Sequence, residues 1–140
     1  KPGMRMLDFG AGSGILSVLA DKMGASYIKA VDYDIAAIEN CRQNFTINRV
    51  SSPHDVLFGS IEKCRTDAPY EFVCVKIIKS TILPVLSELD RLTARPGFLI
   101  LSGLLSQDRD EMNEQLNALN LCDFDIDQFN EWLTYIIQKA

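Results

Sequence analysis

The 140-residue chain is long enough for one domain with a full hydrophobic core, and its hydrophobic fraction of 47% and charged fraction of 24% indicate a globular protein. A net charge of −5 argues against a nucleic-acid groove, although it leaves room for a local basic patch. No apolar run is long enough to cross a membrane and no signal-peptide pattern is present, so we expect a cytoplasmic protein. Four scattered cysteines and the single histidine, His54, predict reduced thiols and no metal site.

Strand-like and helix-like segments alternate along the chain, which predicts a parallel α/β sheet. The first half predicts a strand over residues 4–9, a helix over 13–23, a strand over 27–31, a helix over 35–45, a polar loop over 48–55 and a short strand over 56–58. Asp34 fits the N-terminal cap of the second helix, because its carboxylate can accept a free backbone N–H. His54 falls in the polar loop, where we expect it at the surface.

The second half predicts a strand over residues 72–75, a helix over 80–92, a turn over 95–97 and a central strand over 98–101. It ends in an antiparallel hairpin over 122–137, which we expect at the sheet edge. Asp108 and Glu111 fit a capping box for a further helix between the central strand and the hairpin. Within the hairpin, we expect Trp132 to pack in the core.

The most informative stretch is Asp8–Gly14 (DFGAGSG), which lies between the first strand and the first helix. Glycines permit backbone angles and close approaches that a Cβ blocks, and a helix start offers free N–H groups. A dinucleotide site needs G-x-G-x-x-G, but the position of its third glycine is occupied by Ile15. The chain instead has Gly10, Gly12 and Gly14, preceded by Asp8, in a D-x-G-x-G-x-G pattern.

This pattern resembles motif I of methyltransferases that use S-adenosylmethionine (SAM). The charge of the loop agrees with that resemblance, because Asp8 would repel a pyrophosphate but would favour a cofactor with a cationic sulfonium and an ammonium group. The alternative is a glycine-rich turn between strand and helix that binds no ligand.

Three further residues are candidates for the same site. Asp32 ends the second strand, 22 residues after Gly10, and its carboxylate can accept hydrogen bonds from both hydroxyls of a ribose. Tyr33 could lie against the adenine, and Ser60, after the third strand, could hydrogen-bond to it. The competing interpretations are a helix-capping or solvated acid for Asp32 and an ordinary turn serine for Ser60. No residue stands out as catalytic.

The resemblance extends to the PrmA family, the methyltransferases of large-subunit ribosomal protein eleven, and covers nearly the whole chain. The segments that carry it are Leu7–Leu16, Ala30–Asp34, Gly59–Glu62, Leu101–Leu105 and Glu131–Trp132. It implies a Rossmann-like class I methyltransferase fold, a doubly wound and mostly parallel seven-stranded sheet that ends in an antiparallel hairpin. It also implies SAM as the cofactor, held by Asp8, Gly10, Gly12 and Gly14 around its methionine part and by Asp32 at its ribose. The substrates it implies are lysines and the N-terminus of that ribosomal protein.

Two departures from the family pattern affect the functional hypothesis. Family members carry an N-terminal substrate-docking domain, so residues 1–140 are expected to be a catalytic domain alone. After the fourth strand the family has an asparagine where this chain has Lys76. A protonated lysine about 4 Å from a sulfonium would cost about 4 kcal/mol at an effective dielectric constant near 20. Lys76 must therefore point to solvent, lose its proton, pair with an acid such as Asp8, or weaken SAM binding. We count it among the candidate cofactor-binding residues, because the asparagine it replaces helps to shape the methyl-transfer site in the family.

The leading hypothesis is a SAM-dependent N-methyltransferase acting on a ribosomal protein. A catalytically impaired SAM-binding protein that serves as an interaction module is the second, and Lys76 is the feature that favours it. A methyltransferase acting on a small molecule is the third. The sequence gives no indication of the oligomeric state.

Overall fold

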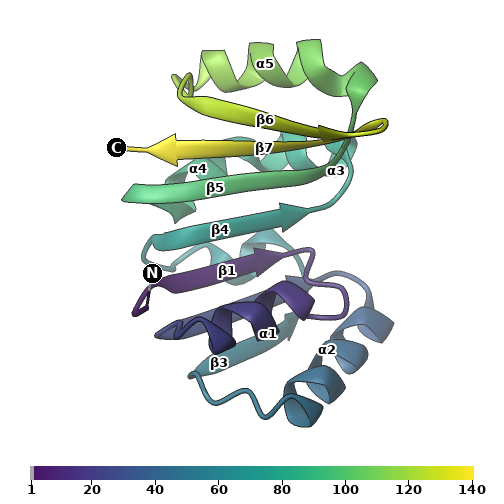
Figure 1. Cartoon of the computed structure of the whole chain (residues 1–140), viewed down its shortest axis with the longest axis vertical. Coiled ribbons are helices and arrows are strands. Elements are labelled where there is room, and N and C mark those ends of the chain that lie inside the picture. Colours follow the sequence, from purple (N-terminus) through teal and green to yellow (C-terminus); the bar gives the residue numbers. More distant parts are fainter. Residues whose placement is uncertain (1) are drawn as a thin grey trace.

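Seven strands form one sheet in the order β3-β2-β1-β4-β5-β7-β6 in the computed structural model, which describes residues 2–140 (Figure 1). The strands are β1 Arg5–Phe9, β2 Tyr27–Asp32, β3 His54–Phe58, β4 Tyr70–Lys76, β5 Thr93–Leu105, β6 Phe124–Phe129 and β7 Trp132–Lys139. The pairs from β3 across to β5 are parallel, whereas β7 runs antiparallel to both of its neighbours. This arrangement confirms the predicted mostly parallel sheet with an antiparallel hairpin at its edge.

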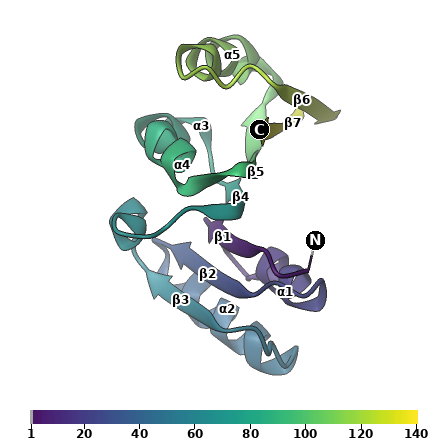
Figure 2. The same cartoon turned by 90° about the vertical axis from the view of Figure 1, so that its left-hand side faces the viewer.

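Helices cover the two faces of the sheet unequally (Figure 2). The α-helices are α1 Ile15–Lys22, α2 Ile35–Ile47, α3 Lys79–Ile82, α4 Leu86–Leu92 and α5 Arg109–Ala118, and the 3-10 turns are η1 Ile61–Cys64, η2 Leu83–Val85 and η3 Ser106–Asp108. One face carries α1 and α2, beside β1, β2 and β3, and the other carries α3, α4 and α5. The larger buried apolar cluster includes residues of α4 and α5, and the smaller one includes residues of α2.

The order of the strands determines where a ligand can bind. From β1 the chain proceeds outward to β2 and β3, and then returns to place β4 on the other side of β1. The connections that leave the carboxyl ends of β1 and β4 therefore run to opposite faces of the sheet, toward α1 and α3. In open α/β sheets this reversal opens a crevice for ligands. The glycine loop follows β1 directly, so it lies at this point of the sheet.

For several elements, the bounds or the type that local sequence patterns predict differ from those in the structure. Pro84 cannot donate the α-helical hydrogen bond, and the helix predicted over 80–92 is divided into α3, η2 and α4. The turn predicted at 95–97 lies within β5, where residues 94–97 stand opposite Glu71 alone. His54 opens β3 and does not lie in the preceding loop. The Asp34 cap is confirmed, since its Oδ1 accepts the backbone N–H of Ala36 at 2.9 Å.

The predicted capping box at the start of α5 is wrong. The Asp108 carboxylate accepts the backbone N–H of Leu105 at 2.8 Å and pairs with Nζ of Lys79 at 3.1 Å. Glu111 pairs with the same ammonium at 2.7 Å. The two acids therefore connect α5 to the start of α3, because a cation brought close by the fold outcompetes the local cap. The prediction that Trp132 packs in the core is also wrong, because this residue is 49% exposed at the start of β7.

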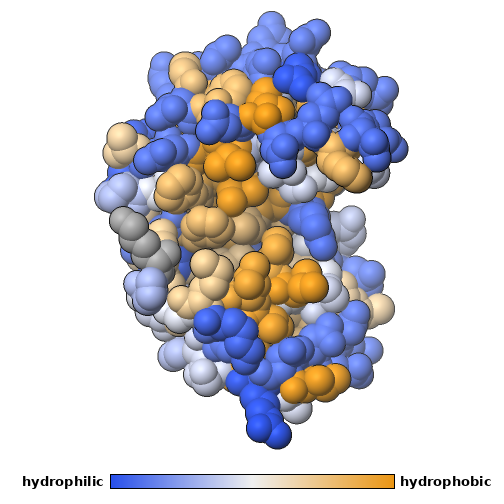
Figure 3. Space-filling view, viewed as in Figure 1, coloured by the Kyte–Doolittle hydropathy of each residue, from blue (hydrophilic) through white to orange (hydrophobic). Residues whose placement is uncertain are grey.

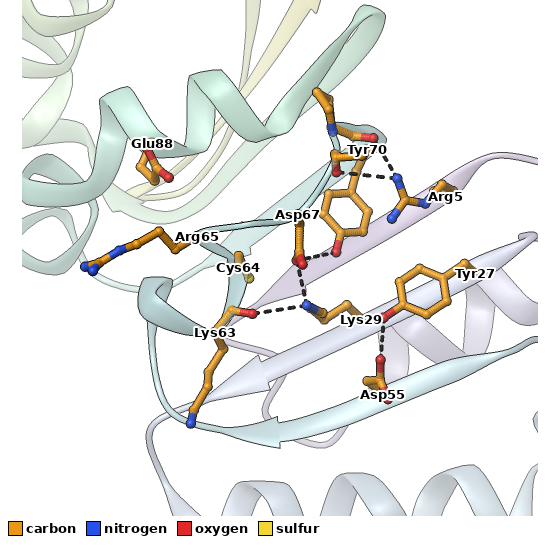
Figure 4. Close-up of polar contacts among 12 residues, drawn as sticks. Arg5, Tyr27, Lys29, Asp55, Lys63, Cys64, Arg65, Asp67, Tyr70 and Glu88 are labelled. Carbon is orange, nitrogen blue, oxygen red and sulfur yellow. Dashed lines mark hydrogen bonds and ion pairs between the residues drawn. The ribbon is translucent and has the colours of Figure 1, made fainter.

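An ion pair between a buried lysine and a half-buried aspartate fastens the connection between β3 and β4 to the sheet (Figure 4). Lys29 of β2 pairs with Asp67 at 2.6 Å and donates a hydrogen bond to the Lys63 carbonyl at 3.1 Å. The Tyr70 hydroxyl donates to the same Asp67 carboxylate at 2.7 Å, and the Arg5 guanidinium lies 4.6 Å from the centre of the Tyr70 ring. The positive charge of Lys29 is thus compensated by a carboxylate and a carbonyl oxygen that the surrounding contacts hold in place.

None of the helices in the described part of the chain is long and apolar enough to cross a bilayer. Among the same residues, no three His, Cys, Asp or Glu side chains are grouped so that they could hold a metal ion. The four cysteines are free thiols, and three of them are buried.

Candidate cofactor site

The three glycines of the loop after β1 all have positive φ angles, of 79°, 57° and 77° for Gly10, Gly12 and Gly14. A Cβ on Gly10 would collide with the Ile77 side chain and lie 2.9 Å from the backbone oxygen of Lys76, and one on Gly14 would lie 2.5 Å from Sγ of Cys41. These two glycines are therefore required by packing. A Cβ on Gly12 would have Nζ of Lys76, 3.8 Å away, as its nearest neighbour. Gly12 is thus the glycine whose open side can admit a ligand.

Asp8 lies beneath this loop and is only 1% exposed. Its Oδ2 accepts the Ser17 hydroxyl at 2.7 Å, which connects the end of β1 to the first turns of α1. Its Oδ1 is buried and has no hydrogen-bond partner among the described residues. Burial raises the pKa of Asp8, while the bond from Ser17 and the nearby Lys76 ammonium oppose that rise. Asp8 is enclosed, so it acts on the loop from below and not by direct contact with a ligand.

Asp32 joins the glycine loop to the end of β2. Its Oδ2 accepts the backbone N–H of Gly12 at 2.8 Å, and its Oδ1 accepts that of Asp34 at 2.9 Å. A carboxylate oxygen has two lone pairs, so each oxygen keeps one acceptor position. The side chain is therefore rigidly placed and still able to accept hydroxyl groups.

One pocket at the carboxyl ends of the strands brings several predicted residues together. Its lining residues are Phe9, Gly10, Val31, Asp32, Tyr33, Gly59, Ser60, Ile77 and Thr81. Gly10, Asp32, Tyr33 and Ser60 come from three separate strand ends, and the sheet order alone makes them neighbours. Tyr33 is 62% exposed, so its ring stands at the margin of the pocket. An apolar wall with a few convergent polar groups is typical of a cofactor site.

The sequence matches the family described as Ribosomal protein L11 methyltransferase (PrmA) over residues 1–140. The chain belongs to this family. It is 31% identical over 141 residues to a ribosomal protein L11 methyltransferase of Thermotoga neapolitana, covering 100% of this chain and 52% of that protein. A counterpart from an Exiguobacterium species is 32% identical over 143 residues, covering 100% of this chain and 45% of its own length. The chain thus spans about half the length of the curated relatives it matches.

Solved structures show the same fold. A ribosomal protein L11 methylase from Lactobacillus delbrueckii subsp. bulgaricus superposes with a TM-score of 0.82 at 23% identity, covering 100% of this chain and 72% of that one. A precorrin 8w decarboxylase from Methanobacterium thermoautotrophicum gives 0.81 at 15% identity, covering 99% and 83% of the two chains. At these identities the likeness establishes the class I methyltransferase fold and nothing finer.

Several residues that shape the site in this member of the PrmA family were not predicted from the sequence. Ser17 holds Asp8, and Ile77 and Thr81 line the pocket from beyond β4. Ser17 was detectable as a polar residue within an apolar helical run. Ile77 and Thr81 carried no such signal, because their place in the pocket depends on β4 pairing with β1.

A larger groove lies between α1 and the sheet. Its lining residues include Met4, Met6, Leu19, Met23, Phe72 and Cys74. Figure 3 shows apolar side chains gathered on this face of the molecule. None of the described residues that line it is charged, so they do not supply the polar groups that would orient a polar cofactor. The smaller pocket at the strand ends is therefore the candidate site.

Proposed function

We propose that this chain binds SAM at the carboxyl ends of β1, β2 and β3 and transfers its methyl group to amino groups of ribosomal protein L11. The observation that carries this proposal is the pocket on which Gly10, Asp32, Tyr33 and Ser60 converge. Membership of the L11 methyltransferase family supports both the cofactor and the substrate. A cytoplasmic location fits the four free thiols, because thiols stay reduced there.

The residues present fit the cofactor part by part. Bound SAM would supply an electrophilic methyl group on a sulfonium. Asp32 would accept hydrogen bonds from the ribose hydroxyls through the lone pairs that the backbone leaves free. Tyr33 would cover the adenine and Ser60 would hydrogen-bond to it. Gly12 would leave room for the methionine part, above the buried Asp8.

The described residues offer no obvious general base for the incoming amine. His54 begins β3, at the edge of the sheet opposite to the pocket. Asp8 is enclosed under the loop. We therefore expect the amine to arrive without its proton, and the contribution of the chain to be the alignment of amine and methyl group. Positioning of this kind can supply most of a bimolecular rate enhancement.

Calorimetric titration with SAM and with NAD tests the cofactor, and transfer of a labelled methyl group to ribosomal protein L11 by the protein at its full natural length tests the reaction. We expect binding of SAM but not of NAD, followed by labelling of L11. A folded protein that fails to bind SAM overturns the cofactor assignment. Binding without transfer to L11 overturns the enzymatic part.

A second candidate function, SAM binding without methyl transfer, is favoured by one observation. Lys76 stands where the family pattern has an asparagine, and its ammonium lies over Gly12. If this replacement disables the reaction, Lys76→Asn gains transferase activity. Equal activity of the two proteins excludes Lys76 as the disabling feature.

A further inference from the structure

The side chain of Lys76 extends over the glycine loop. Lys76 is the last residue of β4, and its Nζ lies 3.8 Å from the position that a Cβ of Gly12 would occupy. Three other lysines, Lys29, Lys79 and Lys139, each pair with a carboxylate at 3.1 Å or less. Among the described residues, no carboxylate lies within ion-pair distance of Lys76, and the buried Asp8 interacts with its charge only at longer range. Its charge is therefore available to an anion that enters above the loop.

The start of α1 adds to the positive character of this place. The helix begins at Ile15, one residue after the loop, with no acidic residue in its first turn and no side chain that caps it. Its first backbone N–H groups and its dipole favour negative charge. The acid below, Asp8, is buried and bonded to Ser17, so it does not neutralise the ammonium by direct contact.

We propose that the ammonium of Lys76 binds the α-carboxylate at the amino-acid end of the cofactor. This inference rests on the proposed function and deepens it, because it assigns a specific contact to the residue that departs from the family pattern. The amino-acid end of SAM carries one anion, the carboxylate, beside two cations, the ammonium and the sulfonium. An exposed lysine above the loop is attracted only to the first of these.

The competing effect is repulsion between Lys76 and the sulfonium, and ligands of different charge separate the two. S-adenosylhomocysteine keeps the carboxylate but has a neutral sulfur. 5′-Methylthioadenosine has a neutral sulfur and lacks the amino-acid end altogether. A contact between Lys76 and the carboxylate strengthens the binding of SAM and S-adenosylhomocysteine alike, whereas repulsion of the sulfonium weakens the binding of SAM alone.

The test is calorimetric titration of the purified protein and its Lys76→Met and Lys76→Arg variants with these three ligands. We expect Lys76→Met to weaken binding of SAM and of S-adenosylhomocysteine by a similar factor, about threefold to tenfold, and to leave 5′-methylthioadenosine unchanged. Lys76→Arg keeps the charge and should stay close to the parent protein. Lys22→Met is the matched control, since Lys22 lies at the far end of α1 and its loss removes the same charge.

Unchanged binding of S-adenosylhomocysteine to Lys76→Met overturns the inference, as does tighter binding of SAM alone. Failure of the parent protein to bind any of the three ligands instead overturns the proposed function. Lys76 is exposed, so its variants should fold, and thermal unfolding of each variant checks that they do.

Discussion

At the scale of single residues, three glycines of the same loop serve different purposes. Gly10 lets the loop lie against the backbone after β4, and Gly14 lets it lie against Cys41 of α2. A Cβ on Gly12 would enter open space, and the backbone N–H of Gly12 donates to the Asp32 carboxylate at 2.8 Å. The loop is thus packed at both ends and open in the middle.

Gly10→Ala should therefore destabilise the protein more than Gly12→Ala. Both substitutions place a Cβ on a left-handed residue, at roughly 1–2 kcal/mol, and Gly10→Ala adds a clash worth roughly 1–3 kcal/mol. Urea unfolding measures the two losses. Equal losses would show that the contacts of Gly10 with Ile77 and Lys76 relax at no cost.

Asp32→Asn should weaken both the fold and the binding of SAM. An amide has a single acceptor oxygen, so one of the N–H groups of Gly12 and Asp34 would lose its partner, at about 1–3 kcal/mol of stability. Asp34→Asn is the control, because asparagine caps a helix about as well as aspartate. Urea unfolding and calorimetry check both variants. A stable Asp32→Asn protein with unchanged SAM affinity contradicts the assigned role.

At the scale of elements, Asp21 joins the end of α1 to the loop before β3. Its Oδ1 accepts the backbone N–H groups of Ser51 and Ser52 at 2.9 and 2.8 Å, and the Ser52 hydroxyl at 2.8 Å. Burial by itself raises the pKa of Asp21, but these hydrogen bonds outweigh it and hold the pKa well below its usual range. The carboxylate is therefore bound more strongly in its charged form.

The contribution of Asp21 to stability should be lost in acid. Because the folded-state pKa is lowered, this contribution is present in full above the unfolded-state pKa of about 3.9, and it declines as the pH falls below that value. Asp21→Asn keeps an acceptor oxygen but not the charge, so it should cost about 1–2 kcal/mol at pH near 7 and progressively less in acid. Urea unfolding across this pH range measures the difference, with the exposed Asp123→Asn as the control. A difference that does not change with pH contradicts the role of the charge.

At the scale of the whole molecule, long-range polar contacts fix segments that the strands alone leave loose. The connection between β3 and β4 is held to β2 by Lys29 and Asp67, whose atoms approach to 2.6 Å. At the other end of the sheet, Lys139 of β7 pairs with Asp90 of α4 at 2.7 Å. Both lysines are buried and both acids are half-buried, so these charges are stable as pairs and costly as single groups.

Lys29→Met should therefore cost about 3–5 kcal/mol, because it leaves the carboxylate of Asp67 without its cation. The double variant with Asp67→Asn should recover part of this loss, since the amide oxygen still accepts the Tyr70 hydroxyl and no charge remains. Urea unfolding of the two single variants and the double variant completes the cycle. Losses that simply add would show that the two charges do not interact.

Local signals predicted the order of the elements and much of the candidate site. The D-x-G-x-G-x-G spacing and the acid at the end of β2 indicated the cofactor, because carboxyl ends of parallel strands meet at one edge. The same local reasoning failed for Asp108 and Glu111, whose spacing fits a capping box. Lys79 lies about 30 residues earlier in the chain, and only the fold brings it to these acids.

By itself, the sequence determined the family, the alternation of strands and helices, and the residues Asp8, Gly10, Gly12, Gly14 and Asp32 as the core of a candidate site. The alternation follows from periodicity, the loop residues follow from their spacing, and Asp32 follows from its place at the end of the second predicted strand. The family follows from resembling segments spread along the chain. The tertiary structure decided the pocket wall of Ile77 and Thr81, the burial of Asp8 under Ser17, and the position of Lys76 over Gly12. The pocket wall and the position of Lys76 depend on β4 pairing beside β1, and contacts between segments that are distant in the chain leave no local pattern to read. The bond between Ser17 and Asp8 depends on how α1 packs back against the end of β1.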